Sequence, residues 1–205
     1  MGDAGMANAA ATYSRGAIWL HWTIAALILF NLPVGWVHDM FGPATKPVMM
    51  TLHKSFGVTI FFLTLVRVGW RLRHAPPPVD PGLRPWEVGL ARVTHIAFYA
   101  ILLLMPLSGW LVTSASGVPV INYFWTVTIP PLPVHGHEAH ELWESVHTLF
   151  GIAMSFLVLL HIAGALRHQF GGQRVLARMA PALDRRTARY RANRGGAENQ
   201  SGAGE

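Results

Sequence analysis

Residues 142–166 read LWESVHTLFGIAMSFLVLLHIAGAL, and this stretch decides the class of fold. Apart from Glu144 near its start, it carries no acidic or basic residue other than histidine. An α-helix rises 1.5 Å per residue, so about 20 apolar residues cross the roughly 30 Å of hydrocarbon in a bilayer. We therefore expect this stretch to span a membrane. His147 and His161 lie inside it, and ionisable residues inside a span are rare and usually functional.

Three other predominantly apolar stretches of similar length lie at about residues 17–37, 48–70 and 94–114. Hydrophobic residues make up 52% of the 205 residues and charged residues 13%, whereas soluble domains carry about 25% charged residues. The sequence therefore predicts an all-α, integral membrane four-helix bundle. We expect one domain at residues 13–181, with flexible termini at 1–12 and 182–205. No internal repeat is evident.

Two connections between the expected spans have a distinct composition. Residues 71–92 are rich in proline and cannot be helical throughout. Residues 116–140 are apolar and aromatic, so we expect them to lie on the membrane surface as a cap, where Trp and Tyr are favoured. The overlapping segment 135–147 gathers histidines and glutamates. It either binds a metal or forms a solvated entry to the last span, and the sequence leaves both open.

Basic residues are distributed unevenly between the two sides of the expected bundle. Of the 16 lysines and arginines, only Lys46 and Lys54 fall on the side opposite the termini. The positive-inside rule then predicts that both termini are cytoplasmic, in a bacterial inner membrane. The net charge of +6 reflects this asymmetry and does not indicate binding to nucleic acid. The basic tail from about residue 173 is expected to be solvated or to contact anionic lipid.

The chain has no cysteine and eleven histidines. The absence of cysteine excludes disulfides, iron–sulfur clusters and haem attached through cysteine. Haem that is held only by side-chain coordination is still allowed. Histidine is its commonest ligand of this kind, so the intramembrane histidines are the candidates.

Four histidines lie at matching depths in the expected spans. His147 and His161 are fourteen residues apart, just under four helical turns, so they share a face and lie about 21 Å apart. His53 lies near the outer end of its span, level with His147, and His21 lies near the cytoplasmic end, level with His161. We predict an outer haem between His53 and His147 and an inner haem between His21 and His161. A single such histidine could instead bond to a neighbouring helix.

Four further residues are candidate cofactor-binding residues. Arg67 and Arg71 end the second span on one helical face, and arginine suits a haem propionate or simply anchors the cytoplasmic side. Lys54, beside His53, is placed to meet an outer propionate or an anionic substrate. His95 begins the third span, where it contacts a propionate or quinone or lies at the interface. His168 is an alternative ligand to His161.

Two glycines follow the predicted outer ligands by four residues. Gly57 follows His53, and Gly151 follows His147. Glycine leaves room where a flat ring lies against the backbone, but it also allows ordinary close packing of helices. The sequence does not decide between these roles.

Four motifs together resemble one known family: YSRGAIWLHW, LHKSFGVTIFFLTLVRVGWRL, GLARVTHIAFYAILLLMPLSGWL and ESVHTLFGIAMSFLVLLHIAGALRHQF. They are similar to the bacterial cytochrome b561 family, which shares its domain type with nickel-hydrogenase cytochrome b subunits. The resemblance covers about residues 13–181. It implies a four-helix bundle with two b haems, whose ligands fall on His21, His53, His147 and His161.

The resemblance also implies a function. Members shuttle electrons between a membrane quinone and a partner, and one branch oxidises superoxide while it reduces ubiquinone. We therefore expect a di-haem cytochrome that carries electrons across the inner membrane, to or from quinone. The alternative is an electron-transferring anchor of a larger dehydrogenase or hydrogenase-type complex, which would co-purify with a soluble redox partner. A haem-free transporter or metal carrier is the third hypothesis, and its purified protein would be colourless.

Overall fold

The computed structural model describes residues 12–79, 82–117, 121–171 and 175–181. The termini that we expect to be flexible, 1–12 and 182–205, lie outside the described residues except for Thr12. The elements are α1 (Arg15–Val37), the 3-10 turn η1 (His38–Met40), α2 (Lys46–Arg73), α3 (Pro85–Ala115), β1 (Ile121–Tyr123), β2 (Val127–Ile129), α4 (His137–Phe170) and α5 (Val175–Met179).

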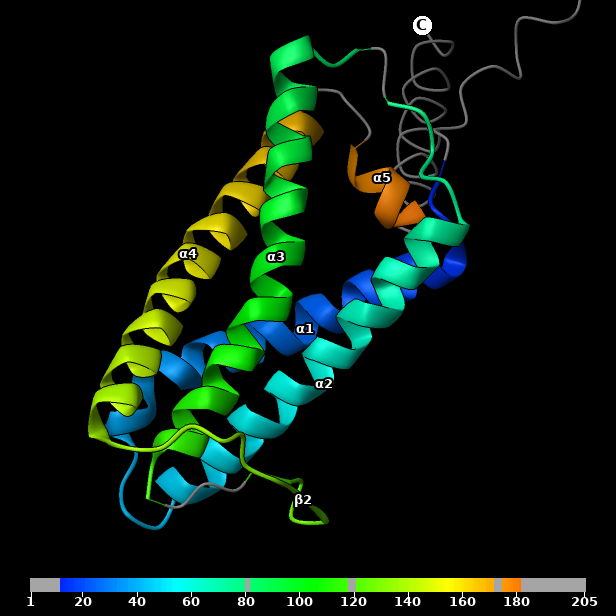
Figure 1. Cartoon of the computed structure of the whole chain (residues 1–205). Coiled ribbons are helices and arrows are strands. Elements are labelled where there is room, and N and C mark those ends of the chain that lie inside the picture. The colour runs from blue at the N-terminus through cyan, green and yellow to red at the C-terminus, as the bar shows by residue number, and fades with distance from the viewer. Residues whose placement is uncertain (1–11, 80–81, 118–120, 172–174, 182–205) are drawn as a thin grey trace, which may run out of the picture.

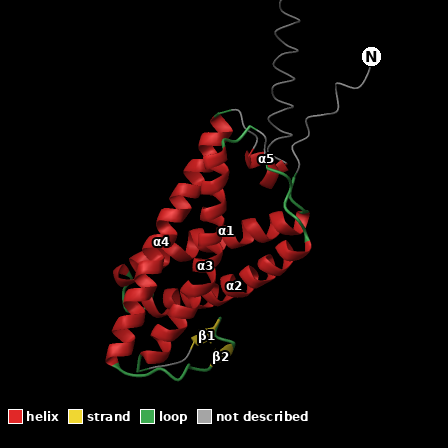
Figure 2. Cartoon of the chain, turned by 45° about the horizontal axis from the view of Figure 1, so that its top comes forward, coloured by secondary structure: helices red, strands yellow, loops and turns green. Residues whose placement is uncertain are grey.

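Four helices dominate the fold and confirm the predicted class. Among the described residues, α1, α2, α3 and α4 are long and apolar enough to cross a membrane. In Figures 1 and 2, α1 and α2 form one antiparallel helical hairpin, and α3 and α4 form a second that crosses it. We call the end that carries Tyr13 and α5 the inner end. Tyr13 and α5 meet there, where the Tyr13 N–H donates to the Arg178 carbonyl at 3.2 Å. The opposite end, with η1 and the strands, is the outer end.

Two helices begin earlier than the apolar pattern indicates. The third helix starts at Pro85, where proline is favoured in the first turn, and the Glu87 carboxylate accepts the Arg84 N–H at 2.9 Å. The fourth starts at His137, whose ring pairs with Glu141 one turn on at 3.1 Å. With 34 residues, α4 is about 51 Å long and extends beyond the roughly 30 Å of hydrocarbon. Hydropathy marks the membrane-crossing part of a helix and not its polar ends.

The centre of the bundle is a layer of apolar side chains, one from each long helix. Ile24, Ile60, Leu102 and Met154 are buried and form one cluster. Burial of apolar side chains between helices excludes water from the middle of the bundle. The layer therefore divides the bundle into an outer half and an inner half.

A short β-hairpin interrupts the otherwise helical chain, and the sequence did not predict it. The Phe124 N–H donates to Ser55 Oγ at 2.9 Å, and Tyr123 Oη lies 3.1 Å from Thr59 Oγ1. These contacts fasten the hairpin to the side of α2. Its turn places Phe124 and Trp125 at φ 44° and 59°, a region that side chains other than glycine rarely adopt. Runs of β-branched and aromatic residues suit both a strand and a membrane surface, which explains the missed strands.

The inner end is closed by the short helix α5. The Trp22 indole N–H donates to the Met179 carbonyl at 2.8 Å. The Arg178 guanidinium donates to the carbonyl of Pro77 at 3.0 Å and to that of Pro78. The segment thus joins α1 to the proline-rich connection between α2 and α3.

Candidate haem-binding sites

His53 of α2 and His147 of α4 face each other in the outer half. Their ring centres lie 6.2 Å apart, and the ring planes are inclined by 80°. Two metal–nitrogen bonds of about 2 Å, with about 1 Å from each ring centre to its nitrogen, place two coordinating imidazoles about 6 Å apart. The observed separation therefore matches that of two rings that share one metal ion.

The neighbouring helices fix which nitrogen of each ring is free. His53 Nδ1 lies 3.1 Å from the Asn31 carbonyl, and His147 Nδ1 lies 3.1 Å from the Met105 carbonyl. A carbonyl only accepts, so each Nδ1 carries the proton and each Nε2 keeps its lone pair for a metal. Ser108 Oγ adds a contact 3.0 Å from His147 Nδ1. This support by a carbonyl is typical of metal-ligating histidine.

Two glycines on the same neighbouring helices hold the rings in place. A Cβ atom added to Gly35 would lie 3.0 Å from Cε1 of His53, and one added to Gly109 would lie 3.0 Å from Cε1 of His147. These distances are tight for carbon atoms, so no larger residue fits without moving the ring. Each imidazole therefore packs directly against the backbone of the adjacent helix.

A cavity lies between the two rings, and each long helix contributes a glycine to its wall. Gly35, Gly57, Gly109 and Gly151 all line it. A Cβ atom at Gly57 would meet nothing within 4 Å, whereas one at Gly151 would make ordinary contacts with Trp36 at 3.7 Å. Of the two roles left open for these glycines, the space at Gly57 favours room for a flat ring. At Gly151 the contacts are those of ordinary packing.

An unpaired polar atom also lines this cavity. Asn31 Oδ1 is buried and has no hydrogen-bond partner among the described residues. Buried polar atoms are nearly always paired, by protein, water or a ligand. The imidazole pair, the glycine walls and this orphaned oxygen together fit a bound planar cofactor.

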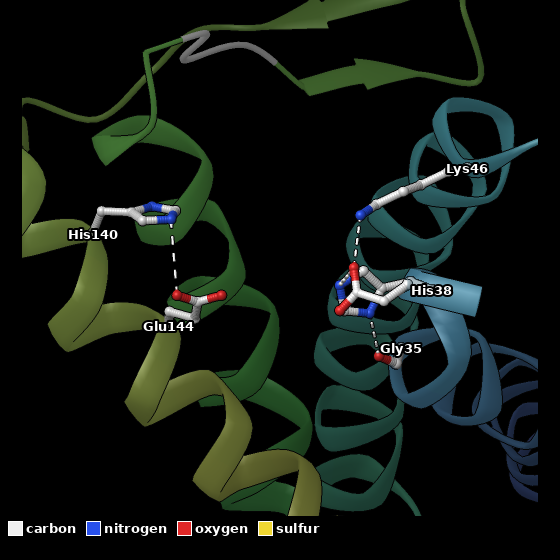
Figure 3. A network of polar contacts seen from close by, with 6 residues as sticks. Gly35, His38, Lys46, His140 and Glu144 are labelled. Atoms are coloured by element: carbon white, nitrogen blue, oxygen red, sulfur yellow. Dashed lines mark hydrogen bonds and ion pairs between the residues drawn. The ribbon is translucent and has the colours of Figure 1, made fainter. Parts of the chain in front are cut away.

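Three polar residues, Lys54, His38 and Glu144, also line the outer cavity. Figure 3 shows His38 and Lys46 on one side of the outer end and Glu144, with His140, on the other. Lys46 Nζ lies 2.6 Å from Asp39 Oδ1, so its charge is compensated. Lys54 is half-buried and pairs with no carboxylate in the part of the chain that the structure describes.

The histidine- and glutamate-rich segment does not gather a metal site. His137 pairs with Glu141 at 3.1 Å and His140 with Glu144 at 3.9 Å, both along α4. Within the described ranges, no three histidine or acidic side chains are grouped to hold a metal ion. Of the two interpretations that the sequence left open, the solvated helix entry is the one that the structure favours.

His21 of α1 and His161 of α4 form the second pair, in the inner half. Their ring centres lie 6.1 Å apart, with planes inclined by 77°. The separation is nearly that of the outer pair, so the structure brings together both histidine pairs that the sequence matched by depth. His161 is the histidine of α4 whose ring faces His21.

A third histidine lies against the inner pair. The ring of His95 is 6.0 Å from that of His161, and the ring of Phe98, on the next turn of α3, is 5.4 Å from it. His95 lies well inside α3, because the helix begins at Pro85. The helix therefore begins well before the position at which the sequence starts the third span, and the ring of His95 lies against the inner pair.

Arg67 is directed into the inner half, while Arg71 is exposed. Arg67 donates from Nε to Tyr99 Oη at 3.3 Å and from Nη1 to the Ala17 carbonyl at 3.2 Å. No carboxylate pairs with Arg67 among the described residues. Arg71 lies over the Tyr99 ring, 6.0 Å from its centre.

Several residues of these sites were not foreseen from the sequence. Each of them contacts His53, His147 or Arg67, or lines the same contact, from a neighbouring helix, α1 or α3. They are Asn31, Gly35, Tyr99, Met105, Ser108 and Gly109. The dipeptide Gly-Trp occurs at 35–36, 69–70 and 109–110, and the first and last of these carry two of the residues.

Comparison with known proteins places the chain in a family. Residues 12–182 match the family model described as prokaryotic cytochrome b561. Cytochrome b561 homolog 2 of Escherichia coli (strain K12) is 30% identical over 73% of this chain and 80% of its own length. The probable superoxide oxidase CybB of Yersinia pestis is 26% identical over 77% and 89%. Cytochrome b562 of Cereibacter sphaeroides is 29% identical over 77% and 87%.

The family match covers most of the chain and includes all four long helices. The four apolar helices and the paired histidines agree with it. The chain therefore belongs to the prokaryotic cytochrome b561 family, as a bacterial multi-pass membrane cytochrome that binds b-type haem and transfers electrons.

Proposed function

We propose that the chain is a di-haem cytochrome that carries electrons across the inner membrane, with one haem b at each end and ubiquinone as a substrate. One observation supports this most strongly. Two histidine pairs have nearly equal ring separations of 6.2 and 6.1 Å, and α4 contributes one ring to each. The rings on α4 are about 21 Å apart along the helix, which suits passage across a bilayer.

The protein's own groups prepare the outer site for iron. A bound haem supplies an iron that gains and loses one electron. His53 and His147 present Nε2, because carbonyls of α1 and α3 hold the proton on Nδ1. The central layer around Ile60 and Met154 keeps water out between the two sites. In this proposal the bundle fixes ring positions before any cofactor binds.

Charged residues near the sites are proposed to hold the carboxylates of the haems. Arg67 faces the inner pair without a carboxylate of its own among the described residues, and a cation inside a span requires a counter-charge. Lys54 lines the outer cavity beside His53 and likewise pairs with no carboxylate among the described residues. Arg71 is exposed and supports the Tyr99 ring. We assign it to the anchoring role and to indirect support of Arg67.

The proposed domain is residues 13–181, with both termini in the cytoplasm. The inner end carries the arginines near residues 67–73 and 167–178, and the outer end carries Lys46 and Lys54. A phosphatase that is active only in the periplasm, fused after residue 205, should be inactive in intact cells. Activity comparable to that of a fusion in the 116–140 connection would contradict this orientation.

His95 is proposed to donate a hydrogen bond to an oxygen at the inner end, from a haem propionate or from the quinone headgroup. The change H95L should distinguish the two, because leucine has no donor and a neutral hydrogen bond contributes about 1 kcal/mol. If the acceptor is quinone, re-oxidation of the reduced protein by a soluble ubiquinone analogue should slow about fivefold at an unchanged inner haem potential. If the acceptor is the propionate, the potential should shift instead. Re-oxidation of the unaltered protein no faster than without quinone would refute the quinone role.

Superoxide oxidation is a second candidate function, favoured by the similarity to the probable superoxide oxidase and by Lys54 at the outer cavity. Superoxide is a small anion, and an uncompensated lysine would attract it. The change K54Q should slow haem reduction by superoxide about threefold to tenfold at low ionic strength, with the difference shrinking in salt. K46Q is the matched control, because Lys46 is paired with Asp39. Equal rates for K54Q and K46Q would argue against the role of Lys54, and no reduction at all would discard the activity.

A further inference from the structure

The two helical hairpins have the same construction at the outer end. In the α1–α2 hairpin, a Cβ atom added to Gly35 would lie 3.0 Å from Cε1 of His53, and in the α3–α4 hairpin, one added to Gly109 would lie at the same distance from Cε1 of His147. Each ring also bonds at 3.1 Å to the carbonyl four residues before that glycine. Two contacts with equal lengths and equal spacing indicate that the hairpins are two copies of one unit.

The sequence agrees once the structure gives the register. The helix that carries the ring reads His-x-x-Phe-Gly at 53–57 in one hairpin and at 147–151 in the other. The helix that supports the ring reads Gly-Trp at 35–36 and at 109–110. These identities are too short and too far apart to show a repeat in the sequence by itself, which explains why none was evident.

The same register holds through the middle of the bundle. Seven residues after His53 is Ile60, and seven residues after His147 is Met154. Both side chains are buried, at 5% and 2% exposure, and both belong to the central apolar layer. The equivalence of α2 with α4 therefore does not end at the outer site.

At the inner end the register makes His21 and His95 equivalent. His21 lies fourteen residues before Gly35, and His95 lies fourteen residues before Gly109. The structure supports this, because both rings lie close to His161, at 6.1 and 6.0 Å. His95 is thus the counterpart of a predicted ligand.

The register also makes Arg67 equivalent to His161. Arg67 follows His53 by fourteen residues, and His161 follows His147 by fourteen residues. Both side chains reach the same two helices: Arg67 bonds to Ala17 of α1 and Tyr99 of α3. The ring of His161 lies against the rings of His21 on α1 and His95 on α3.

We infer that the inner end holds two equivalent ligand positions, and that Arg67 decides which of them binds iron. In this register the positions of His21 and His161 correspond to those of His95 and Arg67, again with one residue from each hairpin. An arginine side chain stays protonated and offers no lone pair, so this second pair cannot bind iron. Its fixed charge, without a carboxylate among the described residues, makes it a site for an anionic group beside the iron. The inference rests on the proposed inner haem. It assigns Arg67 as the residue that determines which of the two ligand positions binds the iron.

A rescue experiment tests this assignment. H161A should reduce the haem content from two per chain to one. The double variant R67H/H161A should restore it to two, because it completes the second pair with His95. The matched control R67Q/H161A has no imidazole at this position and should stay at one haem. Adding H95A to R67H/H161A should return the content to one. The spectrum of the outer haem reports in every variant that the bundle has folded.

The outcomes separate this inference from the proposed function. If H161A keeps two haems, the inner ligand assignment fails and the proposed function with it. If H161A has one haem and R67H/H161A also has one, with the outer haem intact, the two-position inference is overturned and the proposed function stands. Rescue that persists when H95A is added would also overturn it, because another residue would then be the ligand.

Discussion

The H161A variant is expected to retain one haem per chain, with the absorbance and potential of the outer haem unchanged. Alanine offers no lone pair, and among the described residues no other imidazole lies opposite His21 in the way that His161 does. His95 cannot take over in this variant, because the ring that it faces is that of His161 itself. Haem extracted from the purified variant should be half of that from the unaltered protein, and the difference spectrum should lose one component.

His168 provides the control for this prediction. It lies seven residues after His161 on α4, on nearly the same face of the helix. H168A should keep two haems with unchanged spectra. Loss of the inner haem in H168A together with its retention in H161A would contradict the assignment of His161.

Replacing Gly109 with valine is expected to remove the outer haem while every histidine stays in the chain. A Cβ atom at this position would lie 3.0 Å from Cε1 and 3.3 Å from Nδ1 of His147. Valine adds two further methyl groups, so the ring must leave the Met105 carbonyl and turn away from His53. A metal ligand displaced by even 1 Å no longer completes the coordination. The measured haem content should fall from two per chain towards one.

The matched control lies on the same helix. A Cβ atom at Gly89 would meet nothing within 4 Å, so G89V adds the same bulk to α3 without reaching a histidine. It should keep both haems. A G109V protein with two haems and an unchanged outer spectrum would show that the packing of His147 on this glycine does not position a ligand.

The sequence was a good guide to what depends on one helix at a time. Span number follows from apolar length, and the matched depths of the histidine pairs follow from the rise of 1.5 Å per residue. The structure brings His53 to His147 and His21 to His161 as those depths require. Composition could not give the polar helix ends, because Pro85 and His137 lie outside the apolar runs.

The sequence was a poor guide to what depends on contact between helices. The glycines that were singled out, Gly57 and Gly151, are on the ligand helices, whereas Gly35 and Gly109 on the neighbouring helices touch the rings. Which residue faces a ring across an interface depends on the crossing angle and the axial offset of two helices, and neither can be read from one sequence. The role of Tyr99 in holding Arg67 was missed for the same reason.

The register between the two helical hairpins also could not be read from the sequence. His21 and His95 differ in what the apolar pattern says about their place in a span, because that pattern starts the third span at about residue 94. Only the length of α3, which begins at Pro85, makes the two histidines comparable. Equivalent contacts at Gly35 and Gly109 then fix the register that the scattered identities could not.

The amount of haem b per polypeptide tests the central claim most directly. Purified protein should be quantified by its polypeptide content, and haem by extraction and by the reduced-minus-oxidised spectrum of the same sample. The account predicts two haems b per chain, with two spectral components that titrate separately. One haem per chain, or none, would contradict it.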